Sequence, residues 1–400
     1  MDKFLDAANS PLPSSEQKMQ PRLDKVPSLL GQEKPASKES FTLFPEKYSR
    51  KKSLKDKNRL IKSPNILYIL LKIISMTLKL LKILYNIIRI EVYMDLKFKN
   101  YLILAEEFLL DKDLDKAEDL LLKSLKFTCE KDIDEKISVY FELSDIYLKK
   151  ENYHEAKIYF EKILSLKEMA GAYYGLAITN DFSKGDIDYS IKNYKRAIEL
   201  DENYDRAHYY LAHAYDKIGK TDLAIEEFKK VLAIDEYDFV TYNDLGSIYE
   251  IENKNALAEK FVKKSLEINP DYGRALYNMG VLSKKKGDNS LALKYYYEAI
   301  DKFEDPFLFL NMSAVYIEEK NYKSAINILD RGLLDFPNSV NLHYNKACSF
   351  SLLNDKKRAK EELKIAIEIN KDAYKWAKTD NDLCDIVKEL KWLLLKQKKK

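Results

Sequence analysis

The chain has 400 residues, of which 46% are hydrophobic and 33% charged, and only 10 are glycines. This composition is sufficient for a sizeable core but argues against sheet-rich and loop-rich folds, so it favours a helical protein. Three cysteines, Cys129, Cys348 and Cys384, lie far apart without a CxxC pair. Neither a disulfide framework nor a zinc site is therefore predicted, and a reducing compartment fits best.

The small net charge of +3 hides an asymmetry along the chain. Residues 1–93 contain 18 Lys and Arg against 9 Asp and Glu, which leaves 50 against 56 for residues 94–400. The first part is basic and the second is slightly acidic, so the two parts differ in physical character.

Residues 1–63 are predicted to be a disordered basic tail. Seven of the ten prolines fall in residues 1–64, and no sustained apolar period accompanies them. Such a segment cannot bury enough apolar surface to offset the entropy lost on ordering. Its last part, KYSRKKSLKDKNRLIK at 47–62, is a basic run.

Residues 64–93 are predicted to form an apolar helix with a basic stripe. At 100° per residue the polar side chains fall within roughly 120° of the circumference. These are Asn65, Tyr68, Lys72, Ser75, Lys79, Lys82, Asn86 and Arg89. The segment begins too far from the N-terminus for a standard secretory signal peptide.

Contact with a membrane surface is the favoured role for this helix. Its four cations would cost roughly 10–14 kcal/mol inside a bilayer, more than the roughly 5–10 kcal/mol gained from its aliphatic residues. A helix lying in the interface of an anionic membrane, helped by the preceding basic run, fits better. Three alternatives stay open: the helix caps the first repeat, it pairs with its own copy, or translation starts at Met94 and residues 1–93 do not belong to the native protein.

Residues 98–373 repeat with themselves in eight units of 33 to 39 residues. The units start at Phe98, Ile137, Ala170, Asp205, Phe239, Gly273, Pro306 and Val340. The eighth position of every unit is small: Ala105, Ser144, Ala177, Ala212, Gly246, Gly280, Ser313 and Ala347. A second small residue follows twelve or thirteen positions later: Ala117, Ala156, Ser190, Ala224, Ala258, Ala292, Ala325 and Ala359. Paired small residues let two helices approach closely.

This pattern resembles the tetratricopeptide repeat, a helix–turn–helix unit of 34 residues. The resemblance implies an all-α, right-handed α-solenoid over 98–373. Residues 374–400 are then expected to supply a capping helix and a lysine-rich tail, because a solenoid must cover its last apolar face. Local departures are the insertion around TCEKD, the extra residue near SKGDI with Asn180 in place of an aromatic, and Lys346 in place of the usual leucine.

No catalytic, cofactor or metal site is predicted. His154, His208, His213 and His343 lack metal-ligand spacing, and no P-loop, GxGxxG or GxSxG motif occurs. The many carboxylates are expected to be solvated or paired with lysine along helices.

The resemblance implies instead a concave groove, lined by the first helices, that binds an extended peptide or a partner helix. The groove residues expected from it are Arg206, Tyr209, Arg274, Tyr277, Asn278, Lys284, Asn311, Tyr344 and Asn345. Further groove positions are Tyr174, His213, Asn243, Leu310 and Ile317.

Three of these residues recur at the sixth position of successive units: Asn278, Asn311 and Asn345. Asp244 stands at the equivalent place before them. The series resembles the asparagine ladder by which some tetratricopeptide grooves hold a peptide backbone, because an amide offers both a donor and an acceptor. The alternative is that these amides serve only local hydrogen bonds.

The function expected from the sequence is a non-catalytic scaffold or adaptor, cytoplasmic and tethered to a membrane surface. The alternative is a regulatory or substrate-holding subunit of a separate enzyme complex. Nucleic acid is not an expected partner, because the repeat region is net negative. The sequence does not identify the protein partner.

Overall fold

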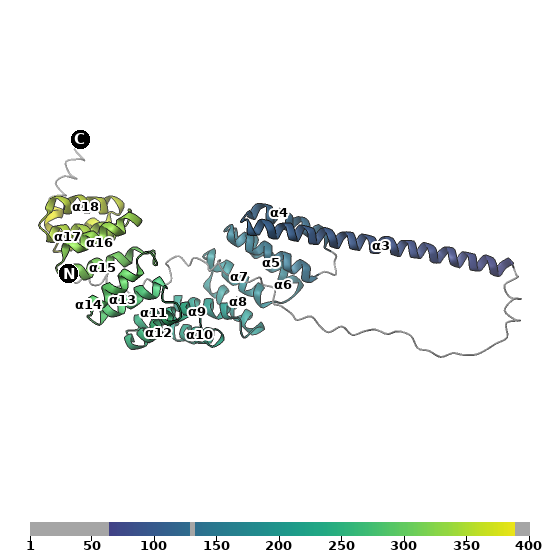
Figure 1. The fold of residues 1–400 in the computed structure, drawn as a ribbon, viewed down its shortest axis with the longest axis horizontal. Coiled ribbons are helices and arrows are strands. Elements are labelled where there is room, and N and C mark those ends of the chain that lie inside the picture. The colour runs from purple at the N-terminus through teal and green to yellow at the C-terminus, as the bar shows by residue number, and fades with distance from the viewer. Residues whose placement is uncertain (1–63, 129–132, 389–400) are drawn as a thin grey trace, which may run out of the picture. The chain divides into compact units, whose positions relative to one another are not determined.

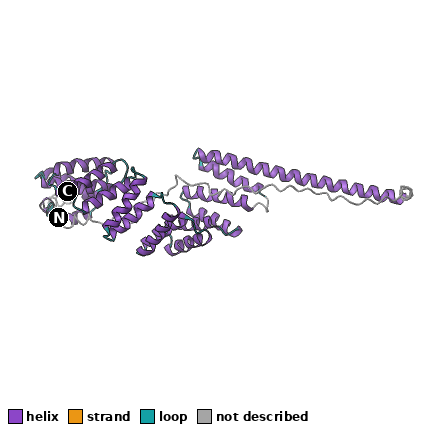
Figure 2. Ribbon diagram, turned by 60° about the horizontal axis from the view of Figure 1, so that its bottom comes forward, coloured by secondary structure: helices purple, strands orange, loops and turns teal. Residues whose placement is uncertain are grey.

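The computed structural model describes residues 64–128 and 133–388. Within these ranges the regular elements are helices, and no strand occurs (Figure 2). The predictions of a disordered tail at 1–63, the TCEKD insertion and the lysine-rich end all fall wholly or partly outside these residues. The described chain divides into two compact units between Glu202 and Asn203.

The first compact unit contains six α-helices and a short 3-10 helix, which Figure 1 shows coloured in chain order. They are α3 (Pro64–Leu110), α4 (Leu114–Ser124), η2 (Leu125–Phe127), α5 (Ile133–Lys149), α6 (Tyr153–Leu166), α7 (Ala170–Phe182) and α8 (Ile187–Leu200). Within it, α3 packs on α4, α5 on α6 and α7 on α8 as antiparallel pairs.

The second compact unit continues the same pattern of paired helices. Its elements are α9 (Asp205–Lys217), α10 (Thr221–Ile234), α11 (Phe239–Ile251), α12 (Asn255–Ile268), α13 (Gly273–Lys285), α14 (Asn289–Ala299), α15 (Pro306–Glu318), α16 (Tyr322–Asp335), α17 (Val340–Leu352), α18 (Lys356–Ile369) and α19 (Asp372–Thr379). Residues 384–388 are also helical. Each first helix packs on the second helix of its own unit, and each second helix packs on the first helix that follows it.

The predicted repeat boundaries agree with the helix boundaries. Six of the eight predicted starts, from Ala170 to Val340, are the first residues of helices. The other two, Phe98 and Ile137, lie inside α3 and α5, which begin earlier. The all-α solenoid of helix–turn–helix units is therefore confirmed.

The turn inside each repeat has one backbone conformation. Its fifteenth residue has a positive φ in all eight units: Lys112, Glu151, Lys184, Gly219, Asn253, Gly287, Lys320 and Asn354. The amide of the next residue returns to a carbonyl near the end of the first helix, as Asn152 N to Tyr147 O does at 2.8 Å. This is the Schellman-type ending of a helix. An Asp or Asn side chain then caps most of the second helices, as Asp355 caps α18.

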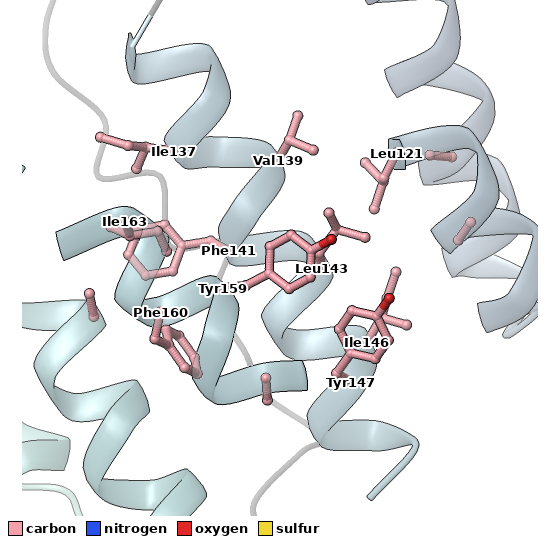
Figure 3. Close-up of a cluster of buried hydrophobic side chains, with 14 of the residues drawn as sticks. Leu121, Ile137, Val139, Phe141, Leu143, Ile146, Tyr147, Tyr159, Phe160 and Ile163 are labelled. Atoms are coloured by element: carbon pink, nitrogen blue, oxygen red, sulfur yellow. The ribbon is translucent and has the colours of Figure 1, made fainter. Parts of the chain in front are cut away.

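The core combines small residues with large side chains that fill the space beside them. In the first compact unit Leu143, Ile146 and Ile163 are completely buried among aromatic rings of α5 and α6 (Figure 3). In the second, a Cβ atom at Gly280 would overlap the ring of Tyr296, which is itself buried. Gly280 is thus a packing residue, as its position in the repeat predicts.

The third repeat shows how its predicted irregularity is accommodated. Asn180, which replaces an aromatic residue, donates from Nδ2 to the carbonyl of Asp186 at 2.7 Å and to Ser190 Oγ at 2.8 Å. These bonds tie the longer turn to both of its helices. α7 and α8 therefore pair normally despite the extra residue.

The helix α3 joins the basic-striped segment to the first repeat without a break (Figure 1). No Gly or Pro occurs between Asn65 and Leu110 to end the helix. Only its last part packs on α4 and η2, through Phe98 and Ala105, whereas every residue from 68 to 93 is exposed. No helix among the described residues combines the length and the apolar character needed to cross a bilayer.

The C-terminal residues cover the last repeat. Ala373, Ala377, Leu383, Ile386 and Val387 are buried with α17 and α18 in one apolar cluster. The described part of the predicted 374–400 cap therefore supplies the apolar cover that the last unit of a solenoid requires.

Candidate functional site

The predicted groove residues lie on the first helices α7, α9, α11, α13, α15 and α17. From α9 onward, hydrogen bonds connect successive units. The sixth residue of one unit bonds the fifth residue of the unit before it. Tyr209 donates to Asp244 at 2.8 Å, Asn278 Nδ2 donates to Asn243 at 2.8 Å, and Asn311 Nδ2 donates to the Tyr277 hydroxyl at 2.9 Å. We name this series the inter-repeat ladder.

The ladder extends into the C-terminal cap. Tyr344, at the fifth position of the last unit, donates its hydroxyl hydrogen to Asp380 at 3.0 Å. Asp380 follows Tyr344 by 36 residues, close to the spacing of 35 between Tyr209 and Asp244. The cap therefore reproduces one contact of a following repeat.

Asn278, Asn311 and Asn345 differ in how strongly their side-chain amides are hydrogen-bonded within the protein. Asn278 and Asn311 are buried, and both amide nitrogens are bonded across units. Asn345 is partly exposed, and the residue that should be its fifth-position partner is Leu310, which has no polar atom. Its Nδ2 lies 3.5 Å from Ser313 Oγ, at the limit of a hydrogen bond. Peptide binding by this series stays a prediction, and Asn345 is the member with the least occupied amide.

The aromatic members of the predicted set are mostly internal. Tyr277 and Tyr344 are 4% and 1% exposed, so their rings contribute to the core rather than to an accessible surface. Tyr277 stacks on Phe303 with ring centroids 4.8 Å apart. Tyr209 is only partly buried and packs edge-to-face on His213.

The cationic members are more accessible. Arg274 is exposed, and Arg206 and Lys284 are partly exposed. Lys284 forms an ion pair with Glu318 of the next first helix. Lys285 likewise pairs with the buried carboxylate of Glu250 from the preceding one. The paired residues are 34 and 35 positions apart in the sequence, which is one repeat. The two ion pairs therefore connect successive units in addition to the hydrogen bonds of the ladder.

Asp244 is a buried carboxylate of the inter-repeat ladder. It is buried and receives the Tyr209 hydroxyl, with His213 Nε2 3.3 Å away. Burial by itself would raise the pKa of this carboxyl. The interactions with His213 and Tyr209 and the charge of Arg274 outweigh burial and hold the pKa of Asp244 below its usual value.

Replacing Asp244 with asparagine should reduce stability in a pH-dependent way. Because the folded pKa is depressed, the carboxylate stabilises the fold above the unfolded pKa of about 3.9, and this contribution is lost as pH falls through the folded pKa. We expect the variant to melt below the wild type at pH 7 and the difference to shrink below about pH 4. Thermal unfolding followed by circular dichroism measures this.

Glu236→Gln is the control for that experiment, because Glu236 is an exposed residue between helices. It should change the melting temperature little at either pH. A difference between Asp244→Asn and wild type that grows as the pH falls would contradict the assigned direction of the shift.

A charge network in the last repeat was not predicted from the sequence. Glu362 of α18 accepts from His343 Nδ1 at 2.6 Å and from Lys346 Nζ at 2.6 Å, and Lys346 also reaches Asp330 at 2.8 Å. Lys346 replaces the usual apolar residue here, and its side chain is only 14% exposed. The same His–Glu pairing recurs in the fourth repeat, where His208 and Glu227 are 2.6 Å apart. In both pairs the glutamate follows the histidine by 19 residues, so this recurring spacing in the sequence could have indicated the pairing.

Three potential metal ligands also meet where the C-terminal cap packs on the last repeat. Ligand atoms of Cys348, Asp380 and Asp382 lie within 4.8 Å of one another. Burial and the two neighbouring carboxylates raise the pKa of the Cys348 thiol well above its usual value. Asp380 of this cluster also accepts the Tyr344 hydroxyl, so the cluster forms part of the cap contact.

Comparison with known protein families matches the repeat units. The tetratricopeptide repeat profile matches residues 137–168, 205–238, 240–272, 273–301 and 340–372, and a TPR repeat profile matches residues 181–219. A comparison with curated proteins finds no matching sequence.

Solved structures with similar folds include other repeat proteins. The APC/C hetero-tetramer Cut9–Hcn1 is 17% identical over 69% of this chain, with a TM-score of 0.49, and this chain spans about half (52%) of it. MamA is 28% identical over 42% of this chain and 94% of its own, with a TM-score of 0.37. YrrB, described as a TPR protein with an unusual peptide-binding site, is 20% identical over 45% of this chain and 93% of its own, with a TM-score of 0.37.

The segments matched by the family profiles coincide with the pairs of helices and with the units defined by small residues at fixed positions. The chain belongs to the tetratricopeptide repeat proteins.

Proposed function

We propose that this protein is a non-catalytic scaffold that binds an extended peptide or helix of a protein partner along the first helices α13, α15 and α17. A tetratricopeptide array supports protein–protein interaction in general. The observation that carries the finer proposal is the interruption of the inter-repeat ladder at Leu310, which leaves the amide of Asn345 weakly bonded on a partly exposed surface.

The surroundings of Asn345 indicate what kind of peptide would fit. Leu310, Ala314 and Ile317 are partly exposed and lie at i, i+4 and i+7 on α15, which packs against α17. An apolar side chain of the ligand can cover this row while its backbone bonds the Asn345 amide. The exposed guanidinium of Arg274 supports an acidic residue elsewhere in the same ligand.

The Asn345→Ala exchange tests the proposal. The full-length variant and wild type are used to capture proteins from native lysate, and the affinity of any peptide identified is then measured for both. Loss of the amide should weaken binding by roughly tenfold, since a hydrogen bond contributes about 1 to 1.5 kcal/mol. An enzyme subunit among the captured proteins would favour the alternative function in an enzyme complex.

The matched control is Asn327→Ala, because Asn327 is exposed on the second helix α16. It should bind like the wild type. Circular dichroism must show that all variants fold alike. Equal affinity of Asn345→Ala and wild type would contradict the assignment of this surface.

A second component of the proposal is that α3 tethers the scaffold to an anionic membrane surface. Residues 68–90 are all exposed, contain the four cations Lys72, Lys79, Lys82 and Arg89, and contain no acidic residue. A broad apolar face opposite a purely basic stripe suits a helix lying in the interface. The exposed leucine and isoleucine side chains in this segment supply the apolar face.

Vesicle flotation tests the tether. The full chain should float with vesicles that contain phosphatidylserine and much less with pure phosphatidylcholine. Changing the four cations to glutamine should lower vesicle affinity by roughly two to three orders of magnitude, at about 1 kcal/mol per charge. Lys229→Gln with Lys260→Gln, on exposed positions of second helices, is the control and should float normally. Equal flotation of the quadruple variant would rule out an electrostatic tether.

A further inference from the structure

An exposed apolar seam, which the tether does not explain, runs along α3 from just before the first repeat to the end of the helix. Val92, Leu96, Ile103 and Leu110 of α3 are 53%, 56%, 55% and 84% exposed. Solenoids require terminal units with a polar outer face, and α3 has an apolar one. We name Val92, Leu96, Lys99, Ile103, Glu106 and Leu110 the α3 seam.

The seam has the spacing of a helix–helix contact. Leu96, Ile103 and Leu110 are seven residues apart, and Val92, Lys99 and Glu106 form a second series with the same spacing. Such alternating intervals of three and four residues place all six side chains on one face of a helix. At 100° per residue, this face lies roughly 130° around the helix from the face of Phe98 and Ala105 that packs on α4. The seam is therefore available while the repeat is folded.

The charges around the seam argue against a membrane as its occupant. From Glu91 to its end at Leu110, α3 contains four acidic residues and only two lysines. The basic stripe ends at Arg89, so the charge of the helix changes sign where the seam begins. An anionic surface would be repelled here, whereas residues 68–90 would attract it.

We infer that the α3 seam binds the same seam of a second copy of this chain, with the two helices antiparallel. The seam contains two charged residues of opposite sign, Lys99 and Glu106, each exposed. With the midpoint of the seam at Tyr101, reversing one helix places Lys99 beside Ile103 of the second copy and about 4.5 Å along the axis from its Glu106. A two-fold axis then forms this pair twice.

A parallel pair has no such complementarity. It would place Lys99 beside Lys99 and Glu106 beside Glu106, and like charges on facing helices destabilise a coiled coil. Lys99 at present bonds Asp95 of its own helix at 2.9 Å, and both side chains are half-exposed, so this bond is weak and exchangeable. The interface spans about 28 Å of helix, which is small, so the dimer should depend on concentration.

Sedimentation equilibrium of the full chain tests the inference. The wild type should form a dimer whose population rises with concentration. Leu96→Glu with Ile103→Glu should be monomeric at every concentration and should still float with anionic vesicles. Ile74→Glu with Leu78→Glu, on the exposed tether segment, should dimerise normally and lose flotation. The dimer thus fails or holds independently of the tether and of peptide capture.

Charge exchange tests the orientation. Lys99→Glu and Glu106→Lys should each raise the dimer dissociation constant by about tenfold, because both symmetry-related pairs become repulsive. The double exchange should restore wild-type affinity. All variants alike would indicate a parallel pair and overturn the antiparallel arrangement. A wild type that is monomeric at every concentration, or a dimer lost equally with Ile74→Glu and Leu78→Glu, would overturn the seam as a dimer interface.

Discussion

Replacing Glu362 with glutamine is expected to lower the free energy of unfolding by about 3 kcal/mol, because the buried Lys346 ammonium then keeps only the exposed Asp330 as a charged partner. Glu362 accepts from His343 and Lys346, and all three side chains are less than 15% exposed. His343 Nε2 also faces the carbonyl of Pro337 at 3.1 Å, so both ring nitrogens face acceptors. The Glu362 carboxylate thus holds the His343 ring and the Lys346 ammonium together. Urea unfolding of the full chain measures the loss.

A triple apolar variant, His343→Leu, Lys346→Leu and Glu362→Leu, should be within about 1 kcal/mol of the wild type or more stable, since apolar replacement of a buried charge set often does no harm. Glu361→Gln, on an exposed position beside Glu362, should change stability by no more than about 0.5 kcal/mol. If the triple variant were as unstable as Glu362→Gln, packing rather than uncompensated charge would explain the loss.

Gly280→Ala is expected to destabilise the protein by roughly 1 to 3 kcal/mol through overpacking. Alanine improves helix propensity by up to about 1 kcal/mol, so propensity alone predicts the opposite sign. The added Cβ would overlap the Tyr296 ring, which is completely enclosed in the core and cannot move without disturbing it. Thermal and urea unfolding of the full chain measure the change.

Tyr296→Leu should relieve the overlap. The loss on adding Gly280→Ala in that background should be smaller than in the wild type, giving a favourable coupling of about 1 kcal/mol between the two sites. Ser290→Ala, on an exposed turn of α14, raises propensity without new contacts and should be neutral or slightly stabilising. Stabilisation by Gly280→Ala would show that the helices can separate at this point and that the glycine is not required for packing.

Most of the repeat geometry could be predicted from the sequence because it depends on residues close together in the chain. Small residues at the eighth position and turn residues at the end of each helix act within one unit, and six predicted starts from Ala170 to Val340 are helix starts. Phe98 was different. The repeat pattern places the first unit at Phe98, but the helix from Pro64 continues through this point without a break, because neither Gly nor Pro interrupts it.

Which of the predicted groove side chains are accessible and which are buried or hydrogen-bonded could not be predicted in the same way. The recurrence of Asn278, Asn311 and Asn345 is visible in the sequence, but the partner of each lies 32 to 35 residues earlier and differs from unit to unit. Whether an amide is buried or accessible depends on that partner and on the stacking of units. The burial of Tyr277 and Tyr344 could not be predicted for the same reason. A tyrosine at this position is equally compatible with an exposed surface.

The turn inside each repeat has an evolutionary consequence. Six of the eight fifteenth residues are not glycine, although the left-handed backbone there costs an L-residue roughly 1 kcal/mol or more and glycine much less. Each of these six turns is therefore an independent place where one replacement can adjust the stability of a single repeat. Gly219 and Gly287 show that both residue types are accommodated in the same array. A lineage could thus retune the unfolding order of its repeats without altering any surface on which a partner depends.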